Sequence, residues 1–188
     1  MSDKRRNPQP LDAAGLEALA LAYVARFATT QAKLAAYLRR KLRERDWQGD
    51  TPPAVDALVR RHADAGHVDD AAWARMKAGS LMRRGYGARR IGDALGQAGI
   101  EEELRMDARP SPRQQRRAAL VLAERRRLGP FAPAPPDRPM RERQIAAMLR
   151  AGHPLDIARR IVDARDAEGL RAWAASPAGE DAGDEECD

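Results

Sequence analysis

The sequence predicts an all-α fold, in the form of an elongated array of three tandem three-helix repeats. Val, Ile and Thr together number 14 of the 188 residues, whereas about one residue in five is alanine. Alanine is the strongest helix former and β-branched residues favour strands, so this composition favours helices. Short basic segments with an apolar residue at every third or fourth position also recur about 55 residues apart, which is typical of stacked helical repeats. These segments are Leu34-xxx-Leu38-xxx-Leu42, Gly87-xxx-Ile91-xxx-Leu95-xxx-Gly99 and Ile145-xx-Met148-Leu149-xx-Gly152.

Residues 11–66 are expected to form the first repeat. Helical spacing places six apolar residues on one face of its first helix. They are Leu16, Leu19, Ala20, Tyr23, Val24 and Phe27. Thr29 or Thr30 is the expected N-cap of the second helix. Thr51 followed by Pro52 is typical of an N-cap and a first helical position, so a third helix is expected to start there.

Residues 67–110 are expected to form the second repeat. Asp69 and Asp70 stand where an apolar helical pattern begins, and acidic side chains there can accept bonds from free backbone amides and face the positive helix end. The Gly85-Tyr86-Gly87 segment is expected to break this helix, and a second helix follows. The repeat closes before Pro110, because a residue preceding proline disfavours the helical conformation.

Residues 111–168 are expected to form the third repeat. Ser111 and Pro112 again have the pattern of a cap followed by a first helical residue. The segment 129–139 contains five prolines, which favour an extended connection over a helix. Two more helices are expected, over about 140–151 and 154–165, which gives nine helices in three groups. Each group has too few large apolar residues to be stable alone, so neighbouring groups are expected to pack together.

Both ends of the chain are expected to lie outside the repeats. Residues 1–10 are interpreted as a disordered basic tail, and residues 169–188 as an acidic tail. The only cysteine, Cys187, lies in the acidic tail and cannot form an internal disulfide, so it is interpreted as an incidental thiol. Met1 to Pro8 lack the apolar core of a secretion signal, and no apolar run approaches the roughly 18 residues that cross a bilayer. A cytoplasmic protein without membrane contact is expected.

The charge of the chain favours polyanionic partners. The formal net charge is +6, but six acidic residues lie in the last nine positions, so the remainder carries a net charge of +12. A body that basic is attracted to nucleic acid or to acidic protein surfaces. Thirty of the 34 basic residues are arginine, whose guanidinium group suits bidentate phosphate contacts, although codon bias also explains the preference for arginine over lysine.

Residue patterns that would support catalysis, metal binding or a cofactor are weak. His62 and His67 are five apart, the wrong spacing for two ligands on one helix face, and are interpreted as a helix residue and a loop residue. Asp69 and Asp70 are better explained as caps than as a Mg²⁺ pair. Gly85-x-Gly87 has no preceding strand and no Gly-Lys-Ser/Thr ending, so it is not a nucleotide loop. We therefore expect no catalytic residues, no metal and no cofactor.

Arginines instead recur on and around the second helix of each repeat. Stacked repeats would bring such basic strips onto a shared surface that could contact a protein partner or DNA phosphates, although any single arginine is better explained as a solvated helix residue. The candidate contact residues are Arg39, Arg40, Arg43, Arg83, Arg84, Arg89, Arg90, Arg116, Arg117, Arg141, Arg143 and Arg150.

Several segments, taken in order, resemble the bacterial RecX family. Gly66-His-Val-Asp-Asp-Ala-Ala-Trp-Ala74 resembles a block of glycine, two apolar residues, Asp-Asp, two variable residues and Phe-Ala. Gly87 to Ile100 resembles the block that follows it. The resemblance continues upstream through 23–42 and downstream through 148–153, and it covers roughly 16–165.

The resemblance implies three tandem three-helix repeats that bind the recombinase RecA. Members of this family lie in the groove of the RecA filament on single-stranded DNA, limit filament growth or promote disassembly, and restrain strand exchange and the SOS response. They are not enzymes. The resemblance therefore implies a regulator of DNA repair and recombination, with the RecA filament as its partner. A monomer is expected, and the arginine strips predict weak, sequence-independent contact with single-stranded DNA.

The chain departs from the family pattern at four places. Phe27 to Gln31 replaces a Glu- or Arg-rich turn, His67 replaces an apolar residue, Ala151 to His153 replaces an arginine and an aromatic residue, and a proline-rich insertion follows Gly129. These departures weaken the transfer of residue roles to the third repeat, and they leave the central repeat the most secure.

Two alternative functions have less support in the sequence. A stand-alone helix-turn-helix protein would use 88–98 as its recognition helix, and the short Gly85-Tyr-Gly87 turn suits it, but no dimerising heptad is visible. A metal-dependent nuclease would need clustered carboxylates outside capping positions, and the sequence does not supply them.

Overall fold

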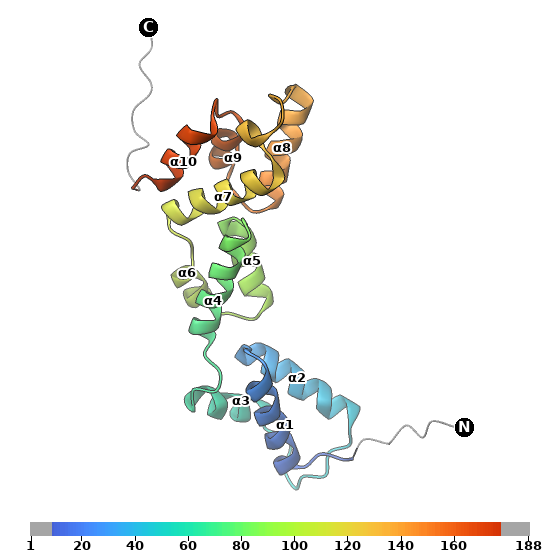
Figure 1. Cartoon of the computed structure of the whole chain (residues 1–188). Helices are drawn as coiled ribbons and strands as arrows, with labels where there is room; N and C mark the ends of the chain where they lie inside the picture. Colours follow the sequence, from blue (N-terminus) through green and yellow to red (C-terminus); the bar gives the residue numbers. More distant parts are fainter. Residues whose placement is uncertain (1–8, 178–188) are drawn as a thin grey trace, which may run out of the picture. The chain divides into compact units, whose positions relative to one another are not determined.

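The all-α class is confirmed. The computed structural model describes residues 9–177, and over that range its only strand-like feature is one isolated parallel bridge between Leu11 and Trp47. It contains ten α-helices and one 3₁₀ helix (Figure 1). The chain divides into two compact units, an amino-terminal unit of residues 9–74 with 97–104 and a carboxy-terminal unit of residues 75–96 with 105–177. The expected basic tail up to residue 8 and the acidic residues from 180 onward, with Cys187, lie outside the described residues.

The helices of the amino-terminal unit start at caps that polar side chains provide. The unit contains α1 (Ala13–Arg26), α2 (Gln31–Glu44), α3 (Val55–Asp64) and the first residues of α4 (Asp70–Arg83). Asp12 accepts a bond from the Gly15 N–H at 2.7 Å at the start of α1. Thr30 accepts one from the Lys33 N–H at 3.2 Å at the start of α2, which confirms one of the two expected caps.

The start of α3 was predicted wrongly. The helix begins at Val55, and its N-cap residue, Ala54, makes no side-chain capping bond. A second proline at position 53 disfavours helical conformation at Pro52, which explains the late start. The Thr51 carbonyl instead accepts a bond from the Trp47 indole N–H at 2.8 Å.

The core of the amino-terminal unit follows the expected apolar spacing, with one exception. Leu34 and Leu38 of α2 are fully buried against Leu16 of α1. Phe27, which was expected on the same inward face, is 48% exposed. The helix ends at Arg26 and the Phe27 backbone is extended (φ −132°, ψ 125°), so its ring leaves the helical stripe.

Residues far apart in the sequence hold the start of α2 in place. The Thr30 hydroxyl donates to the Ala98 carbonyl at 2.7 Å, and the Asp70 carboxylate accepts from the Gln31 N–H at 3.0 Å. A Cβ on Gly99 (φ +76°) would lie 2.2 Å from the Ala32 Cβ, so the backbone here approaches as closely as only glycine allows. Burial raises the pKa of Asp70 above its usual value, despite the bond from the Gln31 amide.

The two acidic residues at the start of α4 therefore have different roles. Asp69 accepts from the Ala72 N–H at 2.7 Å, which is the expected cap of its own helix. Asp70 caps α2 instead, 39 residues away along the chain. Sequence spacing identified both residues as caps but not the second helix.

The carboxy-terminal unit contains most of α4 and all the later helices except the segment 97–104. They are α5 (Ala88–Gln97), α6 (Glu102–Asp107), α7 (Pro112–Arg126), the 3₁₀ helix η1 (Gly129–Phe131), α8 (Arg138–Arg150), α9 (Leu155–Val162) and α10 (Ala167–Ala175). Ser111 and Gln114 form the capping box that the sequence indicated at the start of α7.

The proline-rich connection is less extended than expected. Pro130 lies in the 3₁₀ helix, and Pro139 lies in the first turn of α8, which begins at Arg138. Proline is tolerated in a first helical turn because the amide that it lacks would have no partner there. Asp137 caps α8 by accepting from the Met140 N–H at 2.8 Å.

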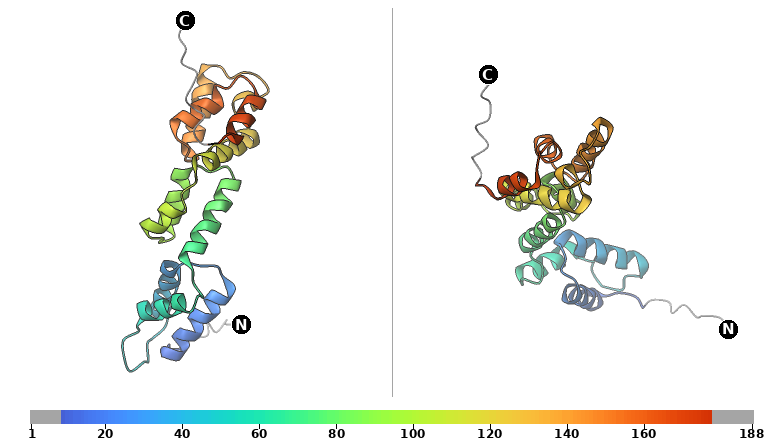
Figure 2. Two further views of the ribbon diagram at one scale, coloured as in Figure 1. Left: turned by 90° about the vertical axis from the view of Figure 1, so that its left-hand side faces the viewer. Right: turned by 45° about the horizontal axis from the view of Figure 1, so that its top comes forward.

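The acidic tail was predicted to begin too early, because residues 167–175 form a tenth helix. Asp166 caps α10 by accepting from the Gly169 N–H at 2.7 Å, and Leu170 and Ala174 are buried. This helix packs on α7, as both sets of views show (Figures 1 and 2). Its short alanine-rich sequence carries only two large apolar residues, Leu170 and Trp173, so its periodicity is weak.

We predict that Leu95→Ala lowers the stability of the carboxy-terminal unit by about 2–5 kcal/mol, because Leu95 is 1% exposed and its truncation leaves a buried cavity. Urea unfolding followed by circular dichroism measures the change. The matched control is Leu155→Ala, which truncates a leucine that is 42% exposed and should cost less than about 1 kcal/mol. Equal losses for the two variants would contradict the packing described.

Candidate partner and nucleic-acid interface

The turn between α4 and α5 is built by close backbone approach. Gly85 has φ +82°, and a Cβ there would lie 2.9 Å from the backbone nitrogen of Leu122 in α7. A Cβ on Gly87 would lie 2.3 Å from the Gly152 carbonyl oxygen. The two glycines therefore allow helices to pack, which is the physical reason why a phosphate-loop interpretation of Gly85-x-Gly87 does not apply.

The turn between α8 and α9 joins the first residues of α5 by hydrogen bonds. The Gly87 N–H donates to the Ala151 carbonyl at 2.9 Å, and the Arg89 N–H donates to the Gly152 carbonyl at 3.3 Å. Gly152 itself has φ +93°. His153 is buried beside this contact, and its Nε2 lies 3.0 Å from the Gly85 carbonyl oxygen. The backbone of α5 is therefore fixed where its arginines begin.

Tyr86 and the arginines around it form a preorganised basic cluster in the carboxy-terminal unit. The guanidinium carbons of Arg84 and Arg90 lie 5.3 Å and 5.5 Å from the centroid of the Tyr86 ring, within the range of cation–π attraction. Arg125 of α7 donates to the Arg84 carbonyl at 2.9 Å. We call Arg84, Tyr86, Arg90 and Arg125 the Tyr86 cluster.

The Tyr86 cluster has uncompensated positive charge. Arg84, Arg90 and Arg125 are exposed, and none of them forms an ion pair with a carboxylate of the described residues. An arginine that stacks on an aromatic ring has already lost part of its side-chain freedom, so less entropy is lost when it binds a phosphate or carboxylate. The arrangement suits an extended anionic partner.

Arg89 belongs to this region but has a structural role. Its Nη2 donates to the Leu149 carbonyl at 2.6 Å, near the C-terminal end of α8. A positive charge there also interacts favourably with the negative end of the helix dipole. Its side chain is thus committed to joining α5 and α8.

Ion pairs partly neutralise the arginine strip of the amino-terminal unit. Arg39 lies 2.6 Å from Asp56, and Arg40 lies 3.6 Å from Glu44. Lys41 also pairs with Glu44, and this bond is the main reason why the pKa of Glu44 lies below its usual value. Arg43 is exposed. Exposed pairs of this kind contribute little stability, so a polyanion could displace them.

The structure removes Arg116 and Arg141 from the predicted contact set. Arg116 is 3% exposed, and its Nη2 donates to the carbonyls of Ser176 and Pro177 at 2.8 Å and 3.1 Å. Arg141 forms a bidentate pair with Asp163, at 2.5 Å and 2.6 Å. The pair raises the pKa of Arg141 and lowers that of Asp163. Both arginines hold helices together and are poorly placed to bind a partner.

The other four predicted arginines, Arg83, Arg117, Arg143 and Arg150, are exposed on α4, α7 and α8. The sequence marks Arg125 only as one of the basic residues of 113–127. Its contact with Arg84 joins α7 to the α4–α5 turn and is not visible in local spacing. The conjunction of an aromatic residue with arginines on both sides at 84–90 was the signal available for Tyr86.

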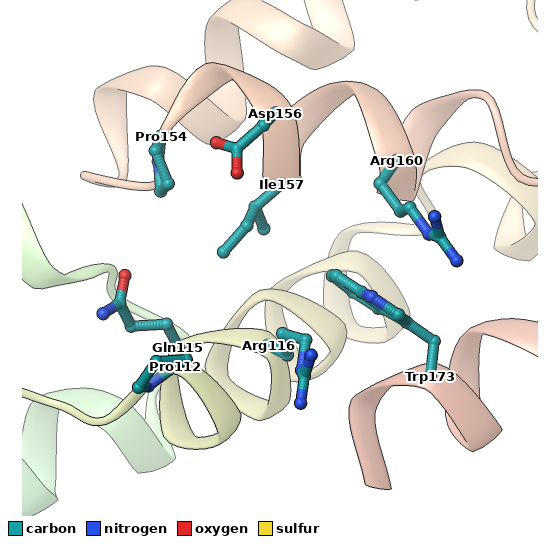
Figure 3. A pocket seen from close by; sticks show the side chains of 8 residues that line it. All are labelled: Pro112, Gln115, Arg116, Pro154, Asp156, Ile157, Arg160 and Trp173. Carbon is teal, nitrogen blue, oxygen red and sulfur yellow. The ribbon is translucent and has the colours of Figure 1, made fainter. Parts of the chain in front are cut away.

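A cavity of about 370 Å³ lies between α7, α9 and α10, where Ile157 and Trp173 point toward α7 (Figure 3). Arg116 and Arg160 lie 5.6 Å and 5.5 Å from the Trp173 ring centroid. Its lining contains one carboxylate, Asp156, and neither histidine nor cysteine. It therefore lacks the paired groups that acid–base or nucleophilic catalysis uses.

His62 lies in α3 and His67 in the loop that follows it, as expected, and the fold brings their two rings together. Gly66 has φ +73°, which turns the chain back after α3. As a result the Nδ1 atoms of the two histidines lie 3.0 Å apart, and the Nε2 atom of buried His62 lies 3.1 Å from Glu17 Oε1. Within residues 9–177, no three His, Cys, Asp or Glu side chains are grouped so as to hold a metal ion.

These features describe a helical binding protein with basic surface arginines. No protein-family model matches the chain. Over 171 residues, which are 86% of this chain and 91% of the relative, it is 31% identical to the Regulatory protein RecX of Myxococcus xanthus (strain DK1622). The chain belongs to the RecX family of regulatory proteins, as the resemblance indicated, and it is a regulator and not an enzyme.

Two solved structures share the fold. The crystal structure of RecX from Lactobacillus salivarius has a TM-score of 0.64 and 19% identity, and the match covers 80% of this chain and 94% of that one. A second crystal structure of regulatory protein RecX has a TM-score of 0.63 and 22% identity, with coverage of 81% and 74%. Among the described residues, no helix is long and apolar enough to cross a membrane.

We predict that the carboxy-terminal unit loses stability as the pH falls below about 6.5. Burial lowers the pKa of His153, outweighing its bond to the Gly85 carbonyl, so the unfolded chain binds a proton more readily than the folded chain. The His153 contribution is complete above the unfolded pKa and decreases below it. His153→Gln retains an N–H donor but does not titrate, so urea unfolding between pH 4.5 and 7.5 should show a flatter slope for this variant. Identical slopes would contradict the assignment.

Proposed function

We propose that this protein binds RecA, both free and as filaments on single-stranded DNA, and inhibits its recombinase activity. It would thereby modulate DNA repair, DNA recombination and the SOS response. The observation that carries the proposal is membership of the RecX family over nearly the whole chain. A protein that acts on such filaments works in the cytoplasm.

The charge distribution supports this partner. A RecA filament on DNA presents acidic protein surface and DNA phosphates together, and the chain outside its last nine residues carries a net charge of +12. The Tyr86 cluster offers three exposed arginines without carboxylate partners among the described residues, and the start of α5, which carries Arg90, is held by hydrogen bonds to the α8–α9 turn. We assign this cluster as the main contact of the carboxy-terminal unit.

The DNA contact in this proposal is weak, sequence-independent and made by a monomer. Arginines that meet phosphates release counterions and read no base sequence. The helix-turn-helix alternative is less favoured, because the first residues of a recognition helix should be free to meet base edges. At the start of α5, the Gly87 and Arg89 amides instead bond to the α8–α9 turn.

We predict that micromolar or lower amounts of the protein inhibit the DNA-dependent ATPase and strand exchange of RecA, with no ATPase or nuclease activity of its own. Arg84→Glu with Arg90→Glu should weaken inhibition at least tenfold through charge reversal, while helicity is preserved. The matched control, Arg60→Glu with Arg159→Glu, changes the net charge equally at two exposed arginines outside the predicted contact set. Unchanged RecA turnover at saturating protein would reject the function, and equal inhibition by both variants would reject only the cluster.

We also predict that affinity for single-stranded DNA falls steeply with salt and is similar for unrelated sequences. Fluorescence anisotropy between about 50 and 200 mM NaCl measures the slope of log affinity against log salt. Arg84→Glu with Arg90→Glu should lower the magnitude of this slope by about one to two, which corresponds to the loss of one or two phosphate contacts. A flat dependence would argue for base readout or for no role of DNA.

A further inference from the structure

A row of three aromatic rings extends from the end of α1 onto α2. The Tyr23 and Tyr37 rings are stacked, with centroids 4.3 Å apart and an interplanar angle of 18°. Phe27 continues the row, with its centroid 5.3 Å from that of Tyr23. We call Phe27, Tyr23 and Tyr37 the aromatic row. Tyr23 and Tyr37 are half-buried between the helices, whereas Phe27 is 48% exposed.

Cations lie at both ends of the aromatic row. Arg26 lies 5.4 Å from the Phe27 centroid, and Arg40 and Lys41 lie 5.5 Å and 5.9 Å from the Tyr37 centroid. Arg26 forms no ion pair within the described part of the chain. The row therefore combines the exposed ring of Phe27 with positive charge at both of its ends.

This combination is more than helix packing requires. Stacking of Tyr23 on Tyr37 joins α1 to α2, but Phe27 contributes little to the core because its extended backbone places the ring at the surface. A half-exposed phenylalanine forgoes part of the free energy that burial would give. An occupant that supplies both a flat ring and negative charge would complement the row.

We propose that the aromatic row is a base-stacking site for single-stranded DNA, in which a base stacks on Phe27 and the neighbouring phosphates meet Arg26 and Arg40. Every base has a π face, so such a site is tolerant of sequence, and alternating aromatic and basic side chains are the usual means of binding single strands. The charge of α2 suits this occupant, because the helix carries five basic residues and one acidic residue. The proposal deepens the DNA contact of the proposed function and rests on it.

A partner protein that buries Phe27 by apolar contact is the competing occupant. A leucine substitution at Phe27 distinguishes the two occupants. Leucine preserves the apolar contact that a protein would use, but it lacks the π face on which a base would stack. Cations at both ends of the row favour the nucleic acid, since an apolar anchor on a protein does not need them.

The test uses the full chain and a fluorescent oligothymidylate of roughly 16 nucleotides that contains one 2-aminopurine, whose emission falls on stacking. Phe27→Ala and Phe27→Leu should both weaken binding about 5- to 150-fold and abolish the quenching. Phe27→Trp should bind at least as tightly as the wild type. The slope of affinity against salt should be unchanged in all three, because the phosphate contacts remain.

Leu21→Ala is the matched control, since Leu21 is a 51% exposed apolar residue of α1 that lies outside the row. It should bind as the wild type does, and circular dichroism melts should show that all variants are folded. Full affinity in Phe27→Leu, or wild-type affinity in Phe27→Ala, would overturn the stacking site.

A parallel RecA ATPase assay separates this inference from the proposed function. Quenching that depends on Phe27, in a protein that never inhibits RecA, would leave the site standing and reject the function. Inhibition of RecA by the wild type, together with unchanged oligonucleotide affinity in the Phe27 variants, would support the function and reject the stacking site.

Discussion

Close approach of backbones is the constraint on which the rest of the fold depends. An alanine-rich chain has few large side chains to fill a core, so its helices must pack at short range. Glycine makes this possible where a Cβ would overlap a neighbour. One such position is Gly87, which faces the Gly152 carbonyl. Another is Gly129, where a Cβ would lie 2.4 Å from the Ile161 carbonyl oxygen. The hydrogen bonds from the Gly87 and Arg89 amides then fix the start of α5, and with it the direction in which Arg90 projects. The contact of Gly87 with the α8–α9 turn thus sets both the packing of the core and the position of surface charge.

Local chemistry predicted much of the fold and missed what distant contacts decide. Ser111 and Thr30 were identifiable as caps because the polar atom and the amide it satisfies are three residues apart. Helix α10 was missed because nine residues with few large apolar side chains carry little periodicity, and its stability comes from packing on α7. Phe27 was placed inward because a helical stripe was extended one residue past the end of the helix.

The candidate site was only half predictable for a related reason. Twelve arginines share one chemistry in the sequence. Arg116 nevertheless binds carbonyls just after the end of α10, and Arg141 binds Asp163, while Arg90 is exposed and lies against the Tyr86 ring. Which arginine is structural depends on carbonyls and carboxylates that are 22 to 61 residues away. Charge counting located the basic character, and only the fold could divide the arginines into those that join helices and those that are free to bind.

The bonds that fix the start of α2 have a consequence for the order in which the chain is made. The amino-terminal unit is completed by residues 97–104. The Thr30 hydroxyl donates to the Ala98 carbonyl and the Gln31 N–H donates to the Asp70 carboxylate, so these two bonds form only when Ala98 and Asp70 are present. On the ribosome, the first three helices therefore emerge before the groups that satisfy them. Native contacts at the start of α2 must wait until about the hundredth residue has left the exit tunnel, so folding of the first unit is coupled to synthesis of the second.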